Sequence, residues 1–244
     1  MWYAAGPMSS FQFACSPWSR IVRAIQNGIS SSGAIPVVLV AALLYFFSRQ
    51  HADSVALVVK QWRLAYGIWI PLLFTSVCGG LIPWVLSLSR ESLKQRWRVD
   101  IFLVVGFWAY KGIEVDAWYK LIAHVVSTDT RLEIILVKIL LDQALYAPLW
   151  AVIVTVLFYR WRLHCYSAAA VRKEICSHGS FAWYRRYVIP ALGINLLVWG
   201  PASIAIFALP LPLQIVCFNI LLVVYVIAVQ TLTSGSADPI KCSA

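Results

Sequence analysis

Long stretches without any charged residue constrain this chain more than any other feature. They cover residues 24–48, 64–89, 143–159 and 187–237. A helix needs roughly 20 mainly apolar residues to cross a bilayer, so the first two stretches can each span once and the last can span twice. Of the 244 residues, 61% are hydrophobic and only 12% are charged, which is more apolar surface than a soluble core could hide. The sequence therefore predicts an integral membrane protein.

The expected fold class is all-α, a polytopic transmembrane helical bundle of about six spans. Strands are not expected, because an open sheet would leave unpaired backbone groups in lipid. Pro210 and Pro212 remove backbone donors, which predicts a turn between the last two spans. Five spans plus a kinked or half-inserted helix are the alternative. The expected spans are residues 31–48, 65–88, 101–125, 133–159, 188–208 and 211–232.

No Gly-Ser linker or internal repeat divides the sequence, so we expect one membrane domain. In this interpretation, residues 1–61 form an N-terminal segment that contains an extra transmembrane helix and a connector. Residues 62–234 form the bundle, and residues 235–244 form a short tail. The segments on one side of six spans carry 13 Lys and Arg residues, and the opposite loops carry 4. Because Lys and Arg stay on the side that is not translocated, both termini are expected to face the matrix or the cytosol.

The formal net charge of +10 favours phospholipid head groups as partners rather than nucleic acid, because no nucleic-acid recognition fold accompanies it. The densest basic segment interleaves Arg with Trp and Tyr, a composition typical of the interfacial belt of membrane proteins. A simple membrane anchor is the first interpretation of this segment, and a specific cardiolipin-type pocket is the alternative. The expected head-group-binding residues are Arg160, Arg162, Arg172, Lys173, Trp183, Tyr184, Arg185 and Arg186.

Charged residues also interrupt the expected third and fourth spans. Charges at such depth are rare, and they mark either paired structural groups or a polar path through a bundle. Lys111 and Glu114 lie three residues apart and form one expected pair, and Gln143 adds a hydrogen-bonding group. The expected intramembrane network consists of Lys111, Glu114, Asp116, Lys120, Lys138, Asp142 and Gln143.

The helical hairpin around a turn at residues 128–130 sets the register of these charges. With a rise of about 1.5 Å per residue in both helices, Asp116 lies level with Asp142, and Lys120 with Lys138. The acid and the base of each helix are four residues apart and share a face, so we expect a neutral quartet. Pairing alone satisfies buried charges, and the structural interpretation is preferred over a transport path for that reason.

Signals of catalysis are poor. The sequence contains no GxSxG, HExxH, P-loop or GxGxxG motif, and its four histidines are scattered at positions 51, 124, 164 and 178. We therefore expect a non-enzymatic protein without catalytic residues, a metal site or a cofactor.

The run WYKL, followed after a spacer by KILLDQALYAP, resembles a known family. This family comprises small mitochondrial, peroxisomal and vacuolar membrane proteins, and it is named for Mpv-seventeen and the twenty-two-kilodalton peroxisomal membrane protein. Its GPxxHxWY motif is followed by a Lys, an Asp-Gln pair and a Pro at a similar separation. The matching residues are Gly112, Trp118, Tyr119, Lys138, Asp142, Gln143 and Pro148, with Trp199, Pro201, Phe207 and Pro210 echoing a second motif.

Departures from the family pattern accompany these matches. Ile113 stands in place of the proline of the first motif and Asp116 in place of its common histidine. The resemblance covers about residues 62–234, and residues 1–60 have no counterpart. It implies a compact helical bundle in an organelle membrane, proposed in the family to form a channel for small solutes.

Two functions follow as hypotheses. The first is a family member adapted as a structural or accessory subunit of a larger membrane complex, with other membrane protein subunits as partners. The alternative is a small-solute channel or pore that supports organelle homeostasis. The expected location is the mitochondrial inner membrane, with the peroxisomal membrane as the alternative. The segment before Asp53 contains Arg20, Arg23 and many serines but no acidic residue, as mitochondrial targeting segments do.

Overall fold

The computed structural model describes residues 49–87 and 97–233. Every regular element in these two ranges is a helix, which confirms the all-α prediction for this part of the chain. The expected span at 31–48 and the expected tail at 235–244 lie outside the described residues.

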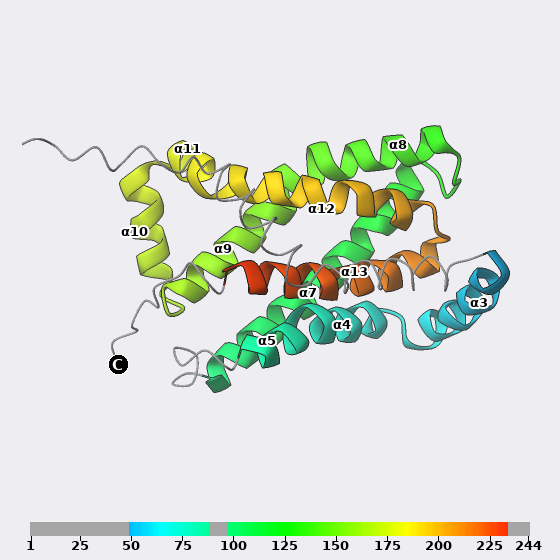
Figure 1. Cartoon of the computed structure of the whole chain (residues 1–244), viewed down its shortest axis with the longest axis horizontal. Helices are drawn as coiled ribbons and strands as arrows, with labels where there is room; N and C mark the ends of the chain where they lie inside the picture. Colours follow the sequence, from blue (N-terminus) through cyan, green and yellow to red (C-terminus); the bar gives the residue numbers. More distant parts are fainter. Residues whose placement is uncertain (1–48, 88–96, 234–244) are drawn as a thin grey trace, which may run out of the picture.

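The first described helix, α3 (Arg49–Tyr66), lies at a steep angle to the rod that follows it (Figure 1). The chain bends by 109° at this break. Gly67 has a φ of +52°, in the left-handed region that glycine enters without strain. The helix expected at 65–88 therefore begins after the bend, and the domain boundary expected after residue 61 lies within α3. The rod consists of α4 (Trp69–Thr75), the π-helix η1 (Ser76–Leu81) and α5 (Ile82–Ser87).

A long helical hairpin forms the centre of the bundle. The helix α7 (Trp97–Val125) has Asp100 in its first turn, where a carboxylate interacts favourably with the helix dipole. The chain turns between residues 126 and 131, as the sequence predicts, and returns as one continuous rod. This rod consists of α8 (Leu132–Leu141), the π-helix η2 (Asp142–Ala151) and α9 (Val152–Leu163).

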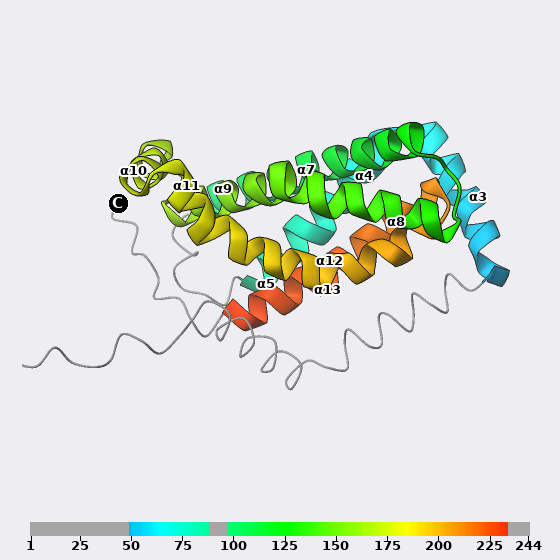
Figure 2. The same ribbon diagram turned by 90° about the horizontal axis from the view of Figure 1, so that it is seen from above.

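A short helix, α10 (Ala168–His178), crosses one end of the bundle. Its N-cap residue Ser167 accepts a hydrogen bond from the Ala170 amide at 3.3 Å, and Gly179 ends it with a φ of +77°. The chain then runs the length of the bundle again and reverses at Pro210, where a break is predicted. Two rods lie side by side here (Figure 2), namely α11 (Ser180–Trp183), η3 (Tyr184–Val188) and α12 (Ile189–Phe207), and then α13 (Leu211–Thr233).

Two rods are long and apolar enough to cross a membrane, at Leu132–Leu163 and Ser180–Phe207. A third is added if the bent pair Ala56–Tyr66 and Trp69–Val85 counts as one span. Among the described residues, this gives two to three candidate spans, and six are not confirmed. The helix α7 has the length of a span but contains more charged residues than a lipid-exposed helix tolerates.

The helix α7 and the α4–η1 rod approach closely because glycines face the contact. Gly112 of α7 is buried, and a Cβ placed on it would lie 2.3 Å from the Pro71 carbonyl oxygen and 2.8 Å from the Thr75 side chain. Gly79 meets Trp108 in the same way, with a Cβ at 2.6 Å from the indole ring. Small residues allow such close backbone approach between membrane helices.

We expect Gly112→Ala to destabilise the fold by about 1–3 kcal/mol, because its Cβ would collide with backbone rather than with a movable side chain. Gly106 is the matched control, since it lies in the same helix and a Cβ there meets nothing within 4 Å. Gly106→Ala should be neutral or stabilising by up to about 1 kcal/mol. Unfolding of the detergent-solubilised protein measures both changes, and equal stability of the two variants would contradict the close contact.

Candidate functional site

The central hairpin carries a polar cluster in the middle of the bundle. The Trp118 indole Nε1 on α7 donates a hydrogen bond to Asp142 Oδ1 at 2.8 Å. Asp142 is the first residue of η2, so this bond joins the two arms of the hairpin. The contact agrees with the predicted register, in which Asp142 lies level with residues near 116.

Asp142 also contacts α12. Its Oδ2 atom accepts hydrogen bonds from Gln143 Nε2 at 2.8 Å and from the Ser203 hydroxyl at 3.3 Å. Asn195 Nδ2 donates to Gln143 Oε1 at 3.3 Å, and both Asn195 and Ser203 belong to α12. No Lys, Arg or His nitrogen in the described ranges lies within 4.0 Å of the Asp142 carboxylate. Three hydrogen-bond donors take the place of a counter-ion.

A second part of the cluster is the ion pair between Lys111 Nζ and Glu114 Oε1, which are 2.5 Å apart. This pair confirms the prediction for these two residues. The Tyr146 hydroxyl donates a hydrogen bond to the same Glu114 oxygen. The Tyr146 ring stacks on Trp118 with the centroids 4.5 Å apart, and the Lys111 ammonium lies 5.9 Å from its centroid. Tyr146 therefore connects the Lys111–Glu114 pair to the Asp142 group.

A cavity of about 140 Å³ is bordered by members of this cluster that include Lys111, Asp142, Gln143 and Tyr146. A π-helix has wider turns than an α-helix, and the π-helix η2 brings Asp142, Gln143, Tyr146 and Ala147 to this one cavity. The polar lining residues are Lys111, Asp142, Gln143, Thr155, Asn195 and Ser203, and the aromatic ones are Trp108, Tyr119, Tyr146, Trp199, Phe218 and Tyr225. The cavity is thus a polar and aromatic chamber within an otherwise apolar bundle.

The predicted quartet of charges is only half correct. Lys120 Nζ lies 2.7 Å from Asp116 Oδ2, which confirms one pair, and Arg63 of α3 joins it at 2.5 Å from Oδ1. The predicted pairing of Lys138 with Asp142 is wrong. Lys138 is buried and donates instead to the Asp129 carbonyl in the hairpin turn at 3.0 Å. A four-carbon stem lets Lys reach a backbone carbonyl at the helix start as readily as a carboxylate one turn further on.

The residues of the two resembling motifs come together in space. The Tyr119 ring packs edge-on against Phe207 with the centroids 5.6 Å apart, and both Tyr119 and Trp199 line the cavity. The Pro148 carbonyl accepts a hydrogen bond from the Tyr184 hydroxyl at 3.1 Å. Pro201 is exposed on α12, while Pro210 lies in the break before α13.

A second polar cluster, which the sequence analysis missed, lies at the end of the bundle that carries α10. Asp100 is 3% exposed and accepts two hydrogen bonds from Arg162, at 2.7 and 2.6 Å. The Tyr166 hydroxyl and Trp84 Nε1 donate to the same carboxylate at 2.5 and 2.9 Å. Asp100 directly precedes the apolar span expected at 101–125 and lies on the same expected side of the membrane as Arg162, which is the signal in the sequence that could have found it.

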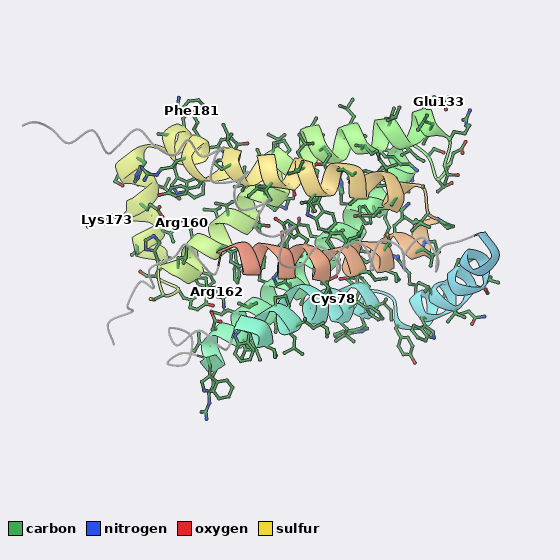
Figure 3. All side chains as sticks on the ribbon, viewed as in Figure 1. Cys78, Glu133, Arg160, Arg162, Lys173 and Phe181 are labelled. Carbon is green, nitrogen blue, oxygen red and sulfur yellow. The ribbon has the colours of Figure 1, made fainter. Side chains whose placement is uncertain are left out.

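Glu174 of α10 binds the neighbouring basic groups at this end. Arg160 donates to both of its oxygens, with Nε at 3.1 Å from Oε2, and His164 Nε2 lies 3.0 Å from Oε2. Figure 3 shows Arg160, Arg162 and Lys173 gathered at this end of the molecule and Glu133 at the other. Arg160 and Arg162 are therefore engaged by protein carboxylates.

The remaining predicted head-group residues divide into two sets. Trp183 is 4% exposed and packs in a core with Val188 and Val152, so its prediction as an interfacial belt residue is wrong. Tyr184 is partly buried and bound to Pro148. The reason is that the chain packs back against α9 after the turn at Gly179, with η3 in contact with α9 and Trp183 in a cluster with Val152. Of the predicted head-group residues, Arg172, Lys173, Arg185 and Arg186 are exposed.

In the described ranges, no group of three or more His, Cys, Asp or Glu side chains is arranged to hold a metal ion. The chemistry that the two clusters offer is electrostatic. The first cluster borders a small cavity with charged and hydrogen-bonding groups, and the second links both α7 and α10 to α9.

Scans against protein-family models, curated proteins and solved structures find no match. The resemblance to the Mpv-seventeen family consequently rests on the motif residues alone.

The attachment of α10 should depend on pH. Burial alone would raise the pKa of Glu174, but hydrogen bonds from Arg160, Tyr187 and His164 hold this pKa below its ordinary value of 4.5. A lowered carboxyl pKa contributes stability above the ordinary value, and this stability is lost as the pH falls through the folded-state pKa. The protection of α10 against hydrogen exchange, corrected for the intrinsic rate at each pH, should therefore fall in the wild type as the pH drops below the ordinary value of 4.5.

The variant Glu174→Gln removes the titrating group, so its α10 should exchange faster at neutral pH and show little further change on acidification. Glu133→Gln, at the opposite end of the bundle, is the control and should keep the wild-type profile. If acidification lowered the protection of α10 as much in Glu174→Gln as in the wild type, another titrating group would be responsible.

Proposed function

We propose that this protein is a non-enzymatic, multi-spanning membrane protein whose central cavity admits a small polar solute, as a channel or pore does. The observation that carries the proposal is the cavity of about 140 Å³ with Lys111, Asp142 and Asn195 in its wall. Ionisable groups are expensive inside a membrane bundle and commonly mark solute pathways. A purely structural clamp needs the paired charges but not the open chamber beside them.

The exterior of the bundle supports the membrane assignment. Large apolar side chains such as Phe102 and Leu140 are 77% and 65% exposed, while Lys111 and Asp116 of α7 are buried. This inverts the arrangement of a soluble protein and suits a helix whose charged side faces the bundle interior. We propose that α7 and α13 also cross the membrane.

For location, we propose the mitochondrial inner membrane with the α10 end of the bundle on the matrix side. The exposed Arg172, Lys173, Arg185 and Arg186 support this orientation, because cations accumulate on the side that is not translocated. Their proposed partners are anionic phospholipid head groups, with cardiolipin as the specific case.

The channel proposal is tested by solute flux into liposomes that contain the purified protein. We expect the wild type to admit polar solutes smaller than the cavity faster than empty liposomes do. Asp142→Asn, which removes the cavity carboxylate, should change the rate at least several-fold. Asp129→Asn, in the turn outside the bundle, is the matched control and should retain wild-type flux. Flux no greater than that of empty liposomes would remove the proposal.

A second candidate function is a structural subunit of a larger membrane complex. The observation that favours it is α3, which leaves the bundle axis with Leu57 61% exposed and Leu64 79% exposed. Such apolar side chains on a projecting helix suit a neighbouring membrane protein. This function predicts that the protein migrates with a large complex on a native gel after mild detergent extraction, and that Leu57→Ser with Leu64→Ser weakens this association. Migration as a monomer would contradict it.

A further inference from the structure

The charges around the central cavity do not cancel among themselves. Lys111 and Glu114 neutralise each other at 2.5 Å. Asp142 has three hydrogen-bond donors and no cation within 4.0 Å among the described residues. Trp118 Nε1 and Gln143 Nε2 can only donate, which is the environment that an ionised carboxylate prefers. With Asp142 ionised, Lys111, Glu114 and Asp142 together carry one net negative charge, and the cavity wall itself presents the Lys111 and Asp142 side chains.

The rest of the lining is unusually rich in aromatic rings. Trp108, Tyr119, Tyr146, Trp199, Phe218 and Tyr225 all border the cavity that Asp142 borders. The faces of aromatic rings attract cations, and the attraction grows when the cation is desolvated. Rings around one carboxylate form the type of site that recognises protonated and quaternary amines.

The volume limits the size of the ligand. At about 140 Å³, the cavity is close to the engineered cavity of about 150 Å³ that holds benzene in another protein. A small alkylammonium ion fits this space, while a nucleotide or a sugar phosphate does not.

From these observations we propose that the central cavity binds a small monovalent organic cation, a protonated or quaternary amine, with Asp142 as its counter-ion and the aromatic rings as its walls. This inference rests on the proposed function, because it names the class of solute that the same cavity takes. An anion would have to displace Glu114 from Lys111 and would face Asp142. A neutral solute would leave the negative charge uncompensated.

Equilibrium binding to the purified full-length protein tests the inference without any transport step. The probe is tetramethylammonium chloride, and the readouts are calorimetry and the fluorescence of the tryptophans. Sodium acetate, glycine and sodium chloride are the anionic, zwitterionic and inorganic arms. We expect saturable binding of tetramethylammonium and at least tenfold weaker binding of the other three. Equal binding of acetate or glycine, binding of sodium alone, or no binding of tetramethylammonium would overturn the inference.

Variants assign the site. Asp142→Asn should weaken tetramethylammonium binding at least tenfold, and Asp129→Asn should leave it unchanged. Phe218→Leu removes one ring without touching the hydrogen bonds of Asp142, and it should weaken binding several-fold. This second variant decides the matter if Asp142→Asn does not fold. Unchanged affinity in either folded cavity variant would contradict the site.

The two proposals fail separately. Solute flux without tetramethylammonium binding would overturn the organic-cation inference and leave the channel standing. Tetramethylammonium binding without solute flux would support the cation site and contradict the channel proposal.

Discussion

The carboxylate of Asp142 is the group on which the arrangement of the bundle depends. A buried carboxylate without partners costs several kcal/mol, and lipid offers no water to supply them. The chain meets this demand with donors from three separate places, namely Trp118 on α7, the neighbouring Gln143, and Ser203 on α12. The hydrogen bonds of this one carboxylate thereby set the relative positions of three helical segments, namely α7, η2 and α12.

Close glycine contacts and a second set of ion pairs hold the surrounding rods. Gly112 and Gly79 allow α7 and the α4–η1 rod to approach closely. At the α10 end, Asp100 and Glu174 bind Arg162 and Arg160 and fix the turn between α9 and α10. Polar groups thus appear where rods must be positioned, and small residues where they must be close.

The composition of the sequence was sufficient to predict an all-helical fold with rods apolar enough to cross a membrane, and proline and turn residues placed the hairpin and the break at Pro210. Short-range pairs were predictable as well, because Lys111–Glu114 and Asp116–Lys120 need only the helical repeat. The partners of Lys138 and Arg162 were not. Their long side chains reach several acceptors, and the choice depends on packing between rods.

Two further features explain why the site was predicted only in part. The π-helix η2 changes which residues of the fourth expected span face inward. No pattern in the sequence predicted this π-helix. Asn195 and Ser203 are single polar residues in a long apolar run, and their roles emerge only when α12 lies against η2. The number of spans likewise depends on how α7 and α13 sit in lipid, which length and composition do not decide.

The most direct test of this account is a double-mutant cycle between Trp118 and Asp142, measured as free energy of unfolding in detergent or lipid. Trp118→Phe removes the indole donor but keeps a ring to stack on Tyr146, and Asp142→Leu removes the acceptor. The account predicts a coupling of about 1 kcal/mol or more between the two changes. Additive effects, with a coupling below about 0.3 kcal/mol, would contradict the claim that this hydrogen bond organises the bundle.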